Sequence, residues 1–275
     1  MKNKIAFVGV GNMASAILGG IVAAGSFNPE NICLFDKIPS QYEKYSNYSF
    51  VKAATVTEAV DFSDFIVLAV KPQNYKDVLT EIKESGIILD GKVFISLAAG
   101  ISTETIEQCL EKNVAIVRTM PNTPMLVGYG VTALCPNALV SDEALETVRG
   151  LFASRGTAFL LPEDKMNPII SVTGSSPAYI YKMIEALYEG ALSEGIDPDG
   201  ILEVICDTVI GSAQMVKESG KTPGELIKMV TSPRGTTEKA MIALEEHGFS
   251  DGIKDAMHRC TIRAEELAKE FRDSI

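Results

Sequence analysis

The feature that most constrains the fold of this chain is a glycine-rich turn near its start. Residues Gly9-Val10-Gly11-Asn12-Met13-Ala14 read G-x-G-x-x-A, directly after the apolar run 5–8 and at the start of a helical pattern over 13–24. The first glycine permits a tight turn, the second lets a pyrophosphate approach the backbone, and the small alanine lets helix and strand pack closely. Amides at the helix start then face the phosphates. The turn predicts a dinucleotide site at Gly9, Gly11, Asn12, Met13 and Ala14.

The N-terminal half continues as short apolar runs that alternate with helical patterns. Further strands are expected at 31–35, 65–69, 92–97, 115–118, 131–135 and 157–161, with helices at 73–83 and 103–112 and one beginning at Ser141. Most of these runs are continuously apolar, which is typical of parallel strands covered on both faces. The pattern therefore predicts an α/β domain over residues 1–162.

The strand pattern stops after Pro162, and an all-helical domain is expected over residues 163–275. Ser176-Pro177, Asp197-Pro198 and Thr222-Pro223 each place a capping side chain before a proline, which is typical of a helix start. Further helices are expected from Thr237 and from about Ser250. The long apolar helix 201–216 fits either an internal core or a contact with a second subunit, and the sequence leaves both open.

Composition excludes several classes of function. The net charge of −11 makes nucleic acid and anionic membranes unfavourable partners. The apolar start of the chain is interrupted by glycines, so neither a signal peptide nor a membrane span is expected. Five cysteines without a C-x-x-C pair favour buried thiols in a reducing cytoplasm, and with only two histidines we expect no metal site.

The end of the second expected strand bears on the choice of cofactor. Asp36 stands where an acidic residue usually accepts from the ribose 2′-hydroxyl of NAD. Lys37 follows at once, with Ser40 and Gln41 near, and these side chains suit the 2′-phosphate of NADP. The residues alone leave the preference between the two cofactors open.

Three further segments are candidates for ligand contacts. Ala69-Val70-Lys71-Pro72 ends a strand at the edge where open α/β sheets bind ligands, although a plain strand-to-helix turn explains it too. Residues 120–124 form a loop stiffened by two prolines. The Ser/Thr/Gly loop 231–237 opens onto a helix and fits either an anion site or an ordinary capping box, two alternatives that its composition does not separate.

Six motifs in this order resemble the pyrroline-5-carboxylate reductase family along nearly the whole chain. They are the glycine-rich turn 9–13 and the segments 69–73, 96–102, 120–124, 177–179 and 231–237. The resemblance implies a Rossmann-type dinucleotide-binding domain followed by a helical dimerisation domain. It also implies an active site completed by both subunits of a homodimer, and dimers that often assemble further into a ring of five, a decamer.

The resemblance also implies the reaction and its residues. The family reduces L-1-pyrroline-5-carboxylate to L-proline, with NADPH as the preferred reductant and NADH as a less efficient one. By resemblance, Gly235, Thr236 and Thr237 offer amides to the substrate carboxylate beside Ser232, and the Thr237 hydroxyl is the catalytic donor to the ring nitrogen. Ala98 joins Lys37, Ala69, Val70, Lys71 and Pro72 as a cofactor contact.

Departures from the family pattern keep two alternatives in view. Arg234 replaces the first glycine of the family's T-S-P-G-G-T-T loop, and residues 167–176 differ from the usual sequence. A related imine or hydroxyacid reductase would need a catalytic lysine, for which Lys182 is the candidate. A non-catalytic dinucleotide sensor is the other alternative, favoured by Arg234.

Overall fold

The computed structural model describes residues 3–275, which divide into two compact units. Residues 3–175 and 259–275 form the sheet unit, and residues 176–258 form the helical unit. This division lies later than the expected boundary at Pro162. The segment after Pro162 stays with the sheet because Asn122 Nδ2 donates to the Thr173 carbonyl at 3.0 Å and Arg118 pairs with Glu163.

One eight-stranded sheet forms the core of the sheet unit, in the order β3-β2-β1-β4-β5-β6-β7-β8. The strands are β1 (Ile5–Val8), β2 (Ile32–Phe35), β3 (Val51–Lys52), β4 (Phe65–Leu68), β5 (Val93–Ser96), β6 (Ala115–Met120), β7 (Gly130–Pro136) and β8 (Gly156–Leu160). All neighbours pair in parallel except β6 and β7, which are antiparallel. The chain reverses its direction of winding between β1 and β4, where such sheets open a crevice for ligands.

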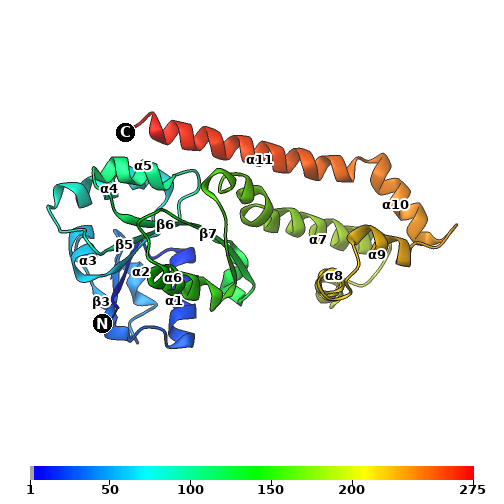
Figure 1. Cartoon of the computed structure of the whole chain (residues 1–275). Coiled ribbons are helices and arrows are strands. Elements are labelled where there is room, and N and C mark those ends of the chain that lie inside the picture. Colours follow the sequence, from blue (N-terminus) through cyan, green and yellow to red (C-terminus); the bar gives the residue numbers. More distant parts are fainter. Residues whose placement is uncertain (1–2) are drawn as a thin grey trace. The chain divides into compact units, whose positions relative to one another are not determined.

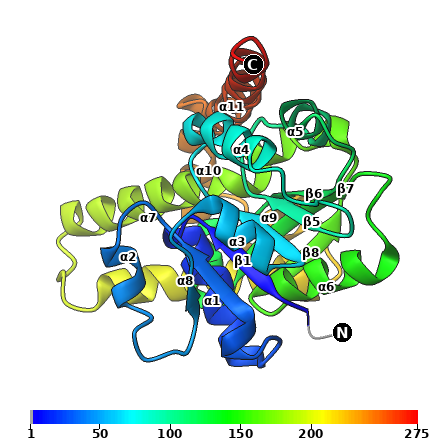
Figure 2. The same cartoon turned by 90° about the vertical axis from the view of Figure 1, so that its left-hand side faces the viewer.

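Helices cover both faces of this sheet, which explains the continuously apolar strands. The helices of the unit are α1 (Asn12–Ala24), α2 (Ser40–Glu43), α3 (Val56–Phe62), α4 (Tyr75–Glu84), α5 (Thr103–Leu110) and α6 (Asp142–Ala153). Side chains of α1 and α6 pack on one face, and those of α3, α4 and α5 pack on the other. Figures 1 and 2 show α4 and α5 on the opposite side of the sheet from α1 and α6. The α/β class predicted from the sequence is confirmed.

Short elements and the chain end complete the sheet unit. They are the 3-10 turns η1 (Pro29–Asn31), η2 (Pro72–Asn74), η3 (Thr123–Val127) and η4 (Glu163–Lys165), and the π-helical η5 (Ile170–Gly174). Residues from 259 onward belong to α11 (Phe249–Arg272), whose backbone passes Gly100 so closely that a Cβ there would lie 3.2 Å from the Ala264 carbonyl oxygen. The α-helices and strands that the sequence pattern missed are β3, α2 and α3, all of them short.

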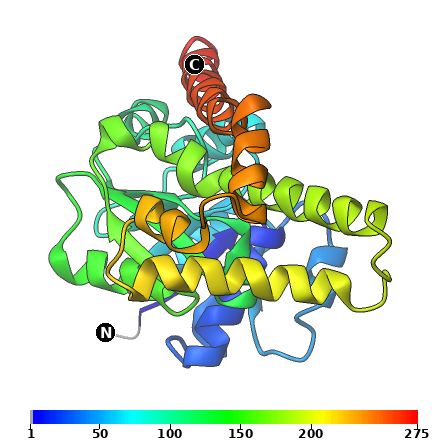
Figure 3. The same ribbon diagram turned by 90° about the vertical axis from the view of Figure 1, so that its right-hand side faces the viewer.

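The helical unit contains α7 (Ser176–Ser193), α8 (Ile201–Glu218), α9 (Pro223–Val230), α10 (Thr236–Glu246) and the start of α11. Figure 3 shows α7 in yellow-green and α8 in yellow as neighbours. Helix α8 begins at Ile201 and not at the expected Asp197-Pro198, because Gly200 adopts a left-handed φ of 77° immediately before it. Helix α9 starts as predicted, with Thr222 and Glu225 forming a capping box.

The helical unit buries very little of its own apolar surface. Ile205 is the single buried residue of 176–258, all of which the structure describes. Large apolar side chains stay exposed in the isolated chain, among them Ile210 at 64%, Met229 at 59% and Val230 at 67%. The apolar surface anticipated from the sequence of 201–216 is therefore not absorbed by an internal core.

None of the helices in residues 3–275 is long and apolar enough to cross a membrane.

Candidate functional site

The glycine-rich turn lies at the carboxyl ends of the central strands and contacts the segment after β4. The Gly9 amide donates to the Phe35 carbonyl at 2.8 Å, and the Ala69 amide donates to the Val8 carbonyl at 2.8 Å. Gly9 has a φ of 96°, and a Cβ on it would lie 2.9 Å from the backbone of Ala69. Only glycine satisfies both the dihedral and the close approach. The structure thus brings the glycine-rich turn and the segment 69–73 together.

Gly11 has a different role, because space is open above it. It is the N-cap of α1 without any side-chain capping bond, and a Cβ on it would meet no atom within 4 Å. Asn12 and Met13 begin the helix, and Ala14 is 1% exposed against the sheet. The first amides of a helix lack intrahelical acceptors. This open, amide-lined turn fits the pyrophosphate of a dinucleotide, and the small Ala14 explains the close helix–strand packing.

Asp36 fastens the end of β2 to the glycine-rich turn. Its Oδ2 accepts from the Val10 amide at 2.7 Å and its Oδ1 accepts from the Ile38 amide at 2.8 Å. The Tyr42 hydroxyl donates to the Asp36 carbonyl at 2.7 Å and accepts from the Asp36 amide. Burial raises the pKa of Tyr42 above its usual range, so the hydroxyl remains a donor. Both carboxylate oxygens of Asp36 therefore already accept hydrogen bonds from backbone amides.

Lys44, which follows α2, reaches the same turn. Its Nζ donates to the Val10 carbonyl at 3.1 Å and to the Ser15 hydroxyl at 2.7 Å. A third, longer contact runs to Gln41 Oε1 at 3.4 Å. The sequence pattern did not select Lys44, because a lysine eight residues beyond Asp36 carries no local signal. Lys37, which it did select, is exposed.

Buried hydroxyl groups connect the ends of β4, β5 and β6. The Tyr75 hydroxyl donates to the Leu68 carbonyl at 2.7 Å and lies 3.1 Å from Ser96 Oγ, which also accepts from the Ala98 amide at 3.4 Å. Thr119 Oγ1 donates to the Ser96 carbonyl at 3.0 Å. Complete burial raises the pKa of Tyr75 far above its usual range. The strand ends that carry Ala69 and Ala98 are thus held by neutral hydrogen bonds.

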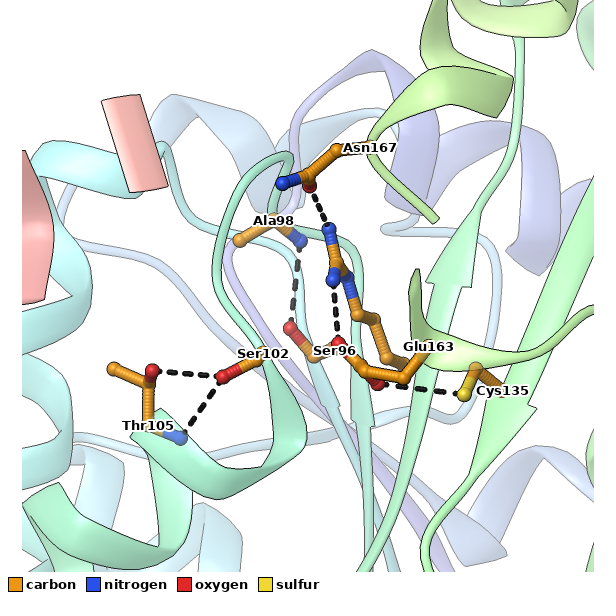
Figure 4. A network of polar contacts seen from close by, with 8 residues as sticks. Ser96, Ala98, Ser102, Thr105, Cys135, Glu163 and Asn167 are labelled. Atoms are coloured by element: carbon orange, nitrogen blue, oxygen red, sulfur yellow. Dashed lines mark hydrogen bonds and ion pairs between the residues drawn. The ribbon is translucent and has the colours of Figure 1, made fainter. Parts of the chain in front are cut away.

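Arg118 is the buried cation of the sheet unit that the sequence pattern did not select. Its side chain is 4% exposed, and its two terminal nitrogens donate to Glu163 Oε1 at 2.5 Å and to Asn167 Oδ1 at 2.6 Å. The Cys135 thiol donates to the other Glu163 oxygen at 3.3 Å (Figure 4). Burial, followed by the charge of Glu163, raises the pKa of Cys135 to about 12. This network fixes the segment after Pro162 beside the end of β6.

The loop 231–237 belongs to the helical unit and forms a tight turn before α10. The Gly235 amide donates to the Ser232 carbonyl at 2.9 Å, and a Cβ on Gly235 would lie 2.4 Å from Ser232 Oγ. Arg234 occupies the left-handed region with a φ of 61°, and its amide donates to Glu238 Oε2 at 2.8 Å. The turn therefore already engages the Gly235 amide, and the contact of this amide with the substrate carboxylate stays a prediction.

Thr236 and Thr237 are the first two residues of α10, and the cap of that helix is Gly235. No side-chain capping bond is present at this end. The amides of these two threonines remain the anion-binding candidates, and a capping role for the loop stays the alternative. Thr237 is half-buried and Thr236 is exposed.

One large cavity lies away from these residues. A cavity of about 700 Å³ lies at the opposite, amino-terminal ends of the strands, beside Phe65, Val93 and Ala115. Within residues 3–275, no group of three His, Cys, Asp or Glu side chains is placed to hold a metal ion.

Val70 is half-buried, whereas Lys71 and Pro72 are exposed at the end of β4.

Two family models match consecutive parts of the chain. Residues 4–100 match the model described as NADP oxidoreductase, coenzyme F420-dependent. Residues 163–267 match the model of pyrroline-5-carboxylate reductase dimerisation. The first match contains the glycine-rich turn and the second contains the loop 231–237.

Full-length relatives match nearly the whole chain. The pyrroline-5-carboxylate reductase of Escherichia coli is 38% identical over 98% of this chain and 100% of its own length, and that of Methanosarcina acetivorans is 37% identical over the same shares. The crystal structure of Plasmodium falciparum pyrroline carboxylate reductase with NADP bound superposes with a TM-score of 0.89 at 29% identity, covering 98% of this chain and 99% of that one. An imine reductase from Streptomyces aurantiacus, 15% identical with a TM-score of 0.58, shares the fold alone. The chain belongs to the pyrroline-5-carboxylate reductase family.

Proposed function

We propose that this chain reduces the C=N bond of L-1-pyrroline-5-carboxylate to L-proline, the last step of proline biosynthesis, with NADPH as the preferred reductant. The observation that carries the proposal is the start of α10, where Thr236 and Thr237 follow the cap residue Gly235 in a loop that differs from the family's sequence at Arg234. The relatives named above support the same reaction.

The residues of the sheet unit fit a dinucleotide. The pyrophosphate fits the open turn at Gly11, with the amides of Asn12 and Met13 facing it, since nothing fills that space. Ala69, Val70, Lys71 and Pro72 and the turn at Ala98 line the neighbouring strand ends, where the ribose and nicotinamide are expected. When bound, the reduced nicotinamide supplies the hydride that the chain itself lacks.

The chain's own contribution to the chemistry is binding, orientation and one proton-bearing contact. The amides of Thr236 and Thr237, beside Ser232, bind the substrate carboxylate at the positive end of α10. The Thr237 hydroxyl contacts the ring nitrogen: it donates a hydrogen bond to the lone pair of the neutral imine, and its oxygen accepts from the N–H once the ring nitrogen is protonated. A protonated imine is the better electrophile, so a neutral hydroxyl suffices and no histidine is required.

A homodimer accounts for the exposed apolar surface of the helical unit, and the match to the dimerisation model supports it. We further propose that five dimers associate into a decamer and that each site takes its loop 231–237 from the partner subunit. Light scattering coupled to gel filtration tests the assembly, and an active monomer would overturn it.

The free cysteines of residues 3–275 support a cytoplasmic location, which cell fractionation tests.

The reaction itself is tested by mixing the purified protein with NADPH and L-1-pyrroline-5-carboxylate. Oxidation of NADPH should be matched mole for mole by L-proline, identified by chromatography against the standard. Binding of NADPH without oxidation, even in a single turnover, would favour the dinucleotide sensor instead.

A substrate panel separates the remaining alternative, a different imine or hydroxyacid reductase. The lysine that such an enzyme needs would be Lys182, which is exposed and pairs with Glu185. The hydrogen bond to Glu185 raises the pKa of this ammonium, which makes it a poorer proton donor. We expect cyclic imino acids to be reduced and 3-oxo acids to be inert, and Lys182→Ala to keep activity.

A further inference from the structure

We propose that Lys44 binds the 2′-phosphate of NADP(H) and is the residue that sets the preference for NADPH over NADH. The inference rests on the proposed use of a dinucleotide and goes beyond it by assigning the discrimination to one side chain. It also differs from the sequence-based expectation, which selected Lys37 together with Ser40 and Gln41.

The position of Lys44 follows from its contacts with Val10. Asp36 accepts from the Val10 amide, and Lys44 donates to the Val10 carbonyl at 3.1 Å, so the two side chains flank the same residue of the turn. The acidic residue at the end of β2 marks the 2′ position of the adenosine ribose in this fold. Because Lys44 is beside Val10 as well, its ammonium group lies close to the position that the 2′-phosphate of NADP would occupy.

The hydrogen bonds of Lys44 leave its charge available. An ammonium group has three donors, and here all three acceptors are neutral: the Val10 carbonyl, the Ser15 hydroxyl and the Gln41 amide oxygen. The Gln41 contact, at 3.4 Å, is the longest of the three and the easiest to exchange. A phosphate oxygen replaces it with a shorter, charge-assisted bond, while the other two bonds hold the ammonium in place.

Asp36 makes a local cation necessary. Its carboxylate is held beside Val10 by two backbone amides and cannot move away from an incoming phosphate. The chain as a whole carries a net charge of −11, so its overall electrostatic potential also opposes binding of the doubly charged 2′-phosphate. Lys44 offsets both effects at the turn itself.

The test compares ligand pairs that differ only in the 2′-phosphate. Dissociation constants are measured by calorimetry for NADPH against NADH, and for adenosine 2′,5′-bisphosphate against adenosine 5′-monophosphate. In Lys44→Gln we expect the affinity for NADPH and for the bisphosphate to fall at least about tenfold. Binding of NADH and of the monophosphate should change less than about twofold, and Lys44→Arg should restore most of the loss.

Lys112→Gln is the matched control, because it removes one positive charge from an exposed position after α5. It should leave the ratio of NADPH to NADH affinity unchanged. Equal losses for both members of each ligand pair in Lys44→Gln would show that Lys44 only braces the turn, and would overturn the assignment. A lost preference in Lys37→Gln with a normal Lys44→Gln would also overturn it.

Failure of this inference is distinguishable from failure of the proposed reaction. Lys44→Gln should still reduce pyrroline-5-carboxylate with saturating NADH, because the nicotinamide end of the cofactor is unaffected. If the parent protein reduces the imine but Lys44→Gln keeps its NADPH preference, the reaction stands and Lys44 does not select the cofactor.

Discussion

Asp36 and Val10 are joined by a hydrogen bond of 2.7 Å from the Val10 amide to the Asp36 carboxylate, which ties the end of β2 to the glycine-rich turn. Since Oδ1 is engaged as well, by the Ile38 amide, we expect Asp36 to act chiefly as a brace. Asp36→Ala should lower the melting temperature and weaken the binding of both cofactors through the loosened turn, with a smaller loss for NADPH because the charge that repels its 2′-phosphate is removed. Loss of NADH binding alone, measured by calorimetry, would instead assign Asp36 to the ribose hydroxyl.

Gly9 and Gly11 should respond oppositely to substitution. Gly9→Ala places a Cβ 2.9 Å from the Ala69 backbone at a φ of 96°, so the free energy of unfolding should fall by at least about 2 kcal/mol. Gly11→Leu has an ordinary φ of −75° and open space, so it should fold normally. Its dinucleotide affinity should nevertheless fall at least about tenfold, because the side chain fills the pyrophosphate position. Normal NADPH binding by Gly11→Leu would refute the placement.

Thr237→Ala tests the catalytic hydroxyl. The variant keeps the backbone amide, and the helix keeps Gly235 as its cap, so KM and the melting temperature should change little. The loss should appear in kcat, by about ten- to a hundred-fold, as expected for one hydrogen bond to a group whose charge changes. Thr237→Ser should recover most of the rate. A variant that melts early but turns over normally would contradict this role.

Arg234 stands in a backbone conformation that favours glycine. Arg234→Gly should raise the free energy of unfolding by about 1 kcal/mol, because glycine has no Cβ and adopts the φ of 61° without strain. Arg234→Ala keeps the Cβ and should show no such gain. If the guanidinium assists the substrate carboxylate, both variants share a higher KM. Denaturant titration and steady-state kinetics on the pair separate the backbone effect from the charge effect.

Glu163→Ala should destabilise the sheet unit strongly, since it leaves the guanidinium of the 4% exposed Arg118 side chain without its anion. We expect a loss of about 2–3 kcal/mol in the free energy of unfolding, measured by urea titration. The neighbouring Asp164 pairs with Lys165 at the surface, so Asp164→Ala is a matched control with little effect. Equal stability of both variants would show that the Arg118 network is not structurally important.

The sequence determined the elements whose signal is local. The glycine-rich turn, the buried parallel strands, the capping box of α9 and the start of α6 at Ser141 all depend on neighbouring residues, and all appear where predicted. The short β3, α2 and α3 escaped prediction because two, four and seven residues carry too little periodicity to separate from a loop. The start of α8 was also misplaced, because the left-handed φ of Gly200 makes the helix begin at Ile201 and composition does not predict that φ.

Tertiary structure alone decided which side chains meet across long sequence separations. Lys44 contacts Val10 and Ser15 because α2 folds back over the turn, and Arg118 meets Glu163 and Asn167 because the segment after Pro162 returns to the end of β6. It also showed that the Gly235 amide is already used and that the helical unit buries only Ile205 by itself. Hydrogen bonds and burial depend on distances in space, which a one-dimensional pattern of residue types does not contain.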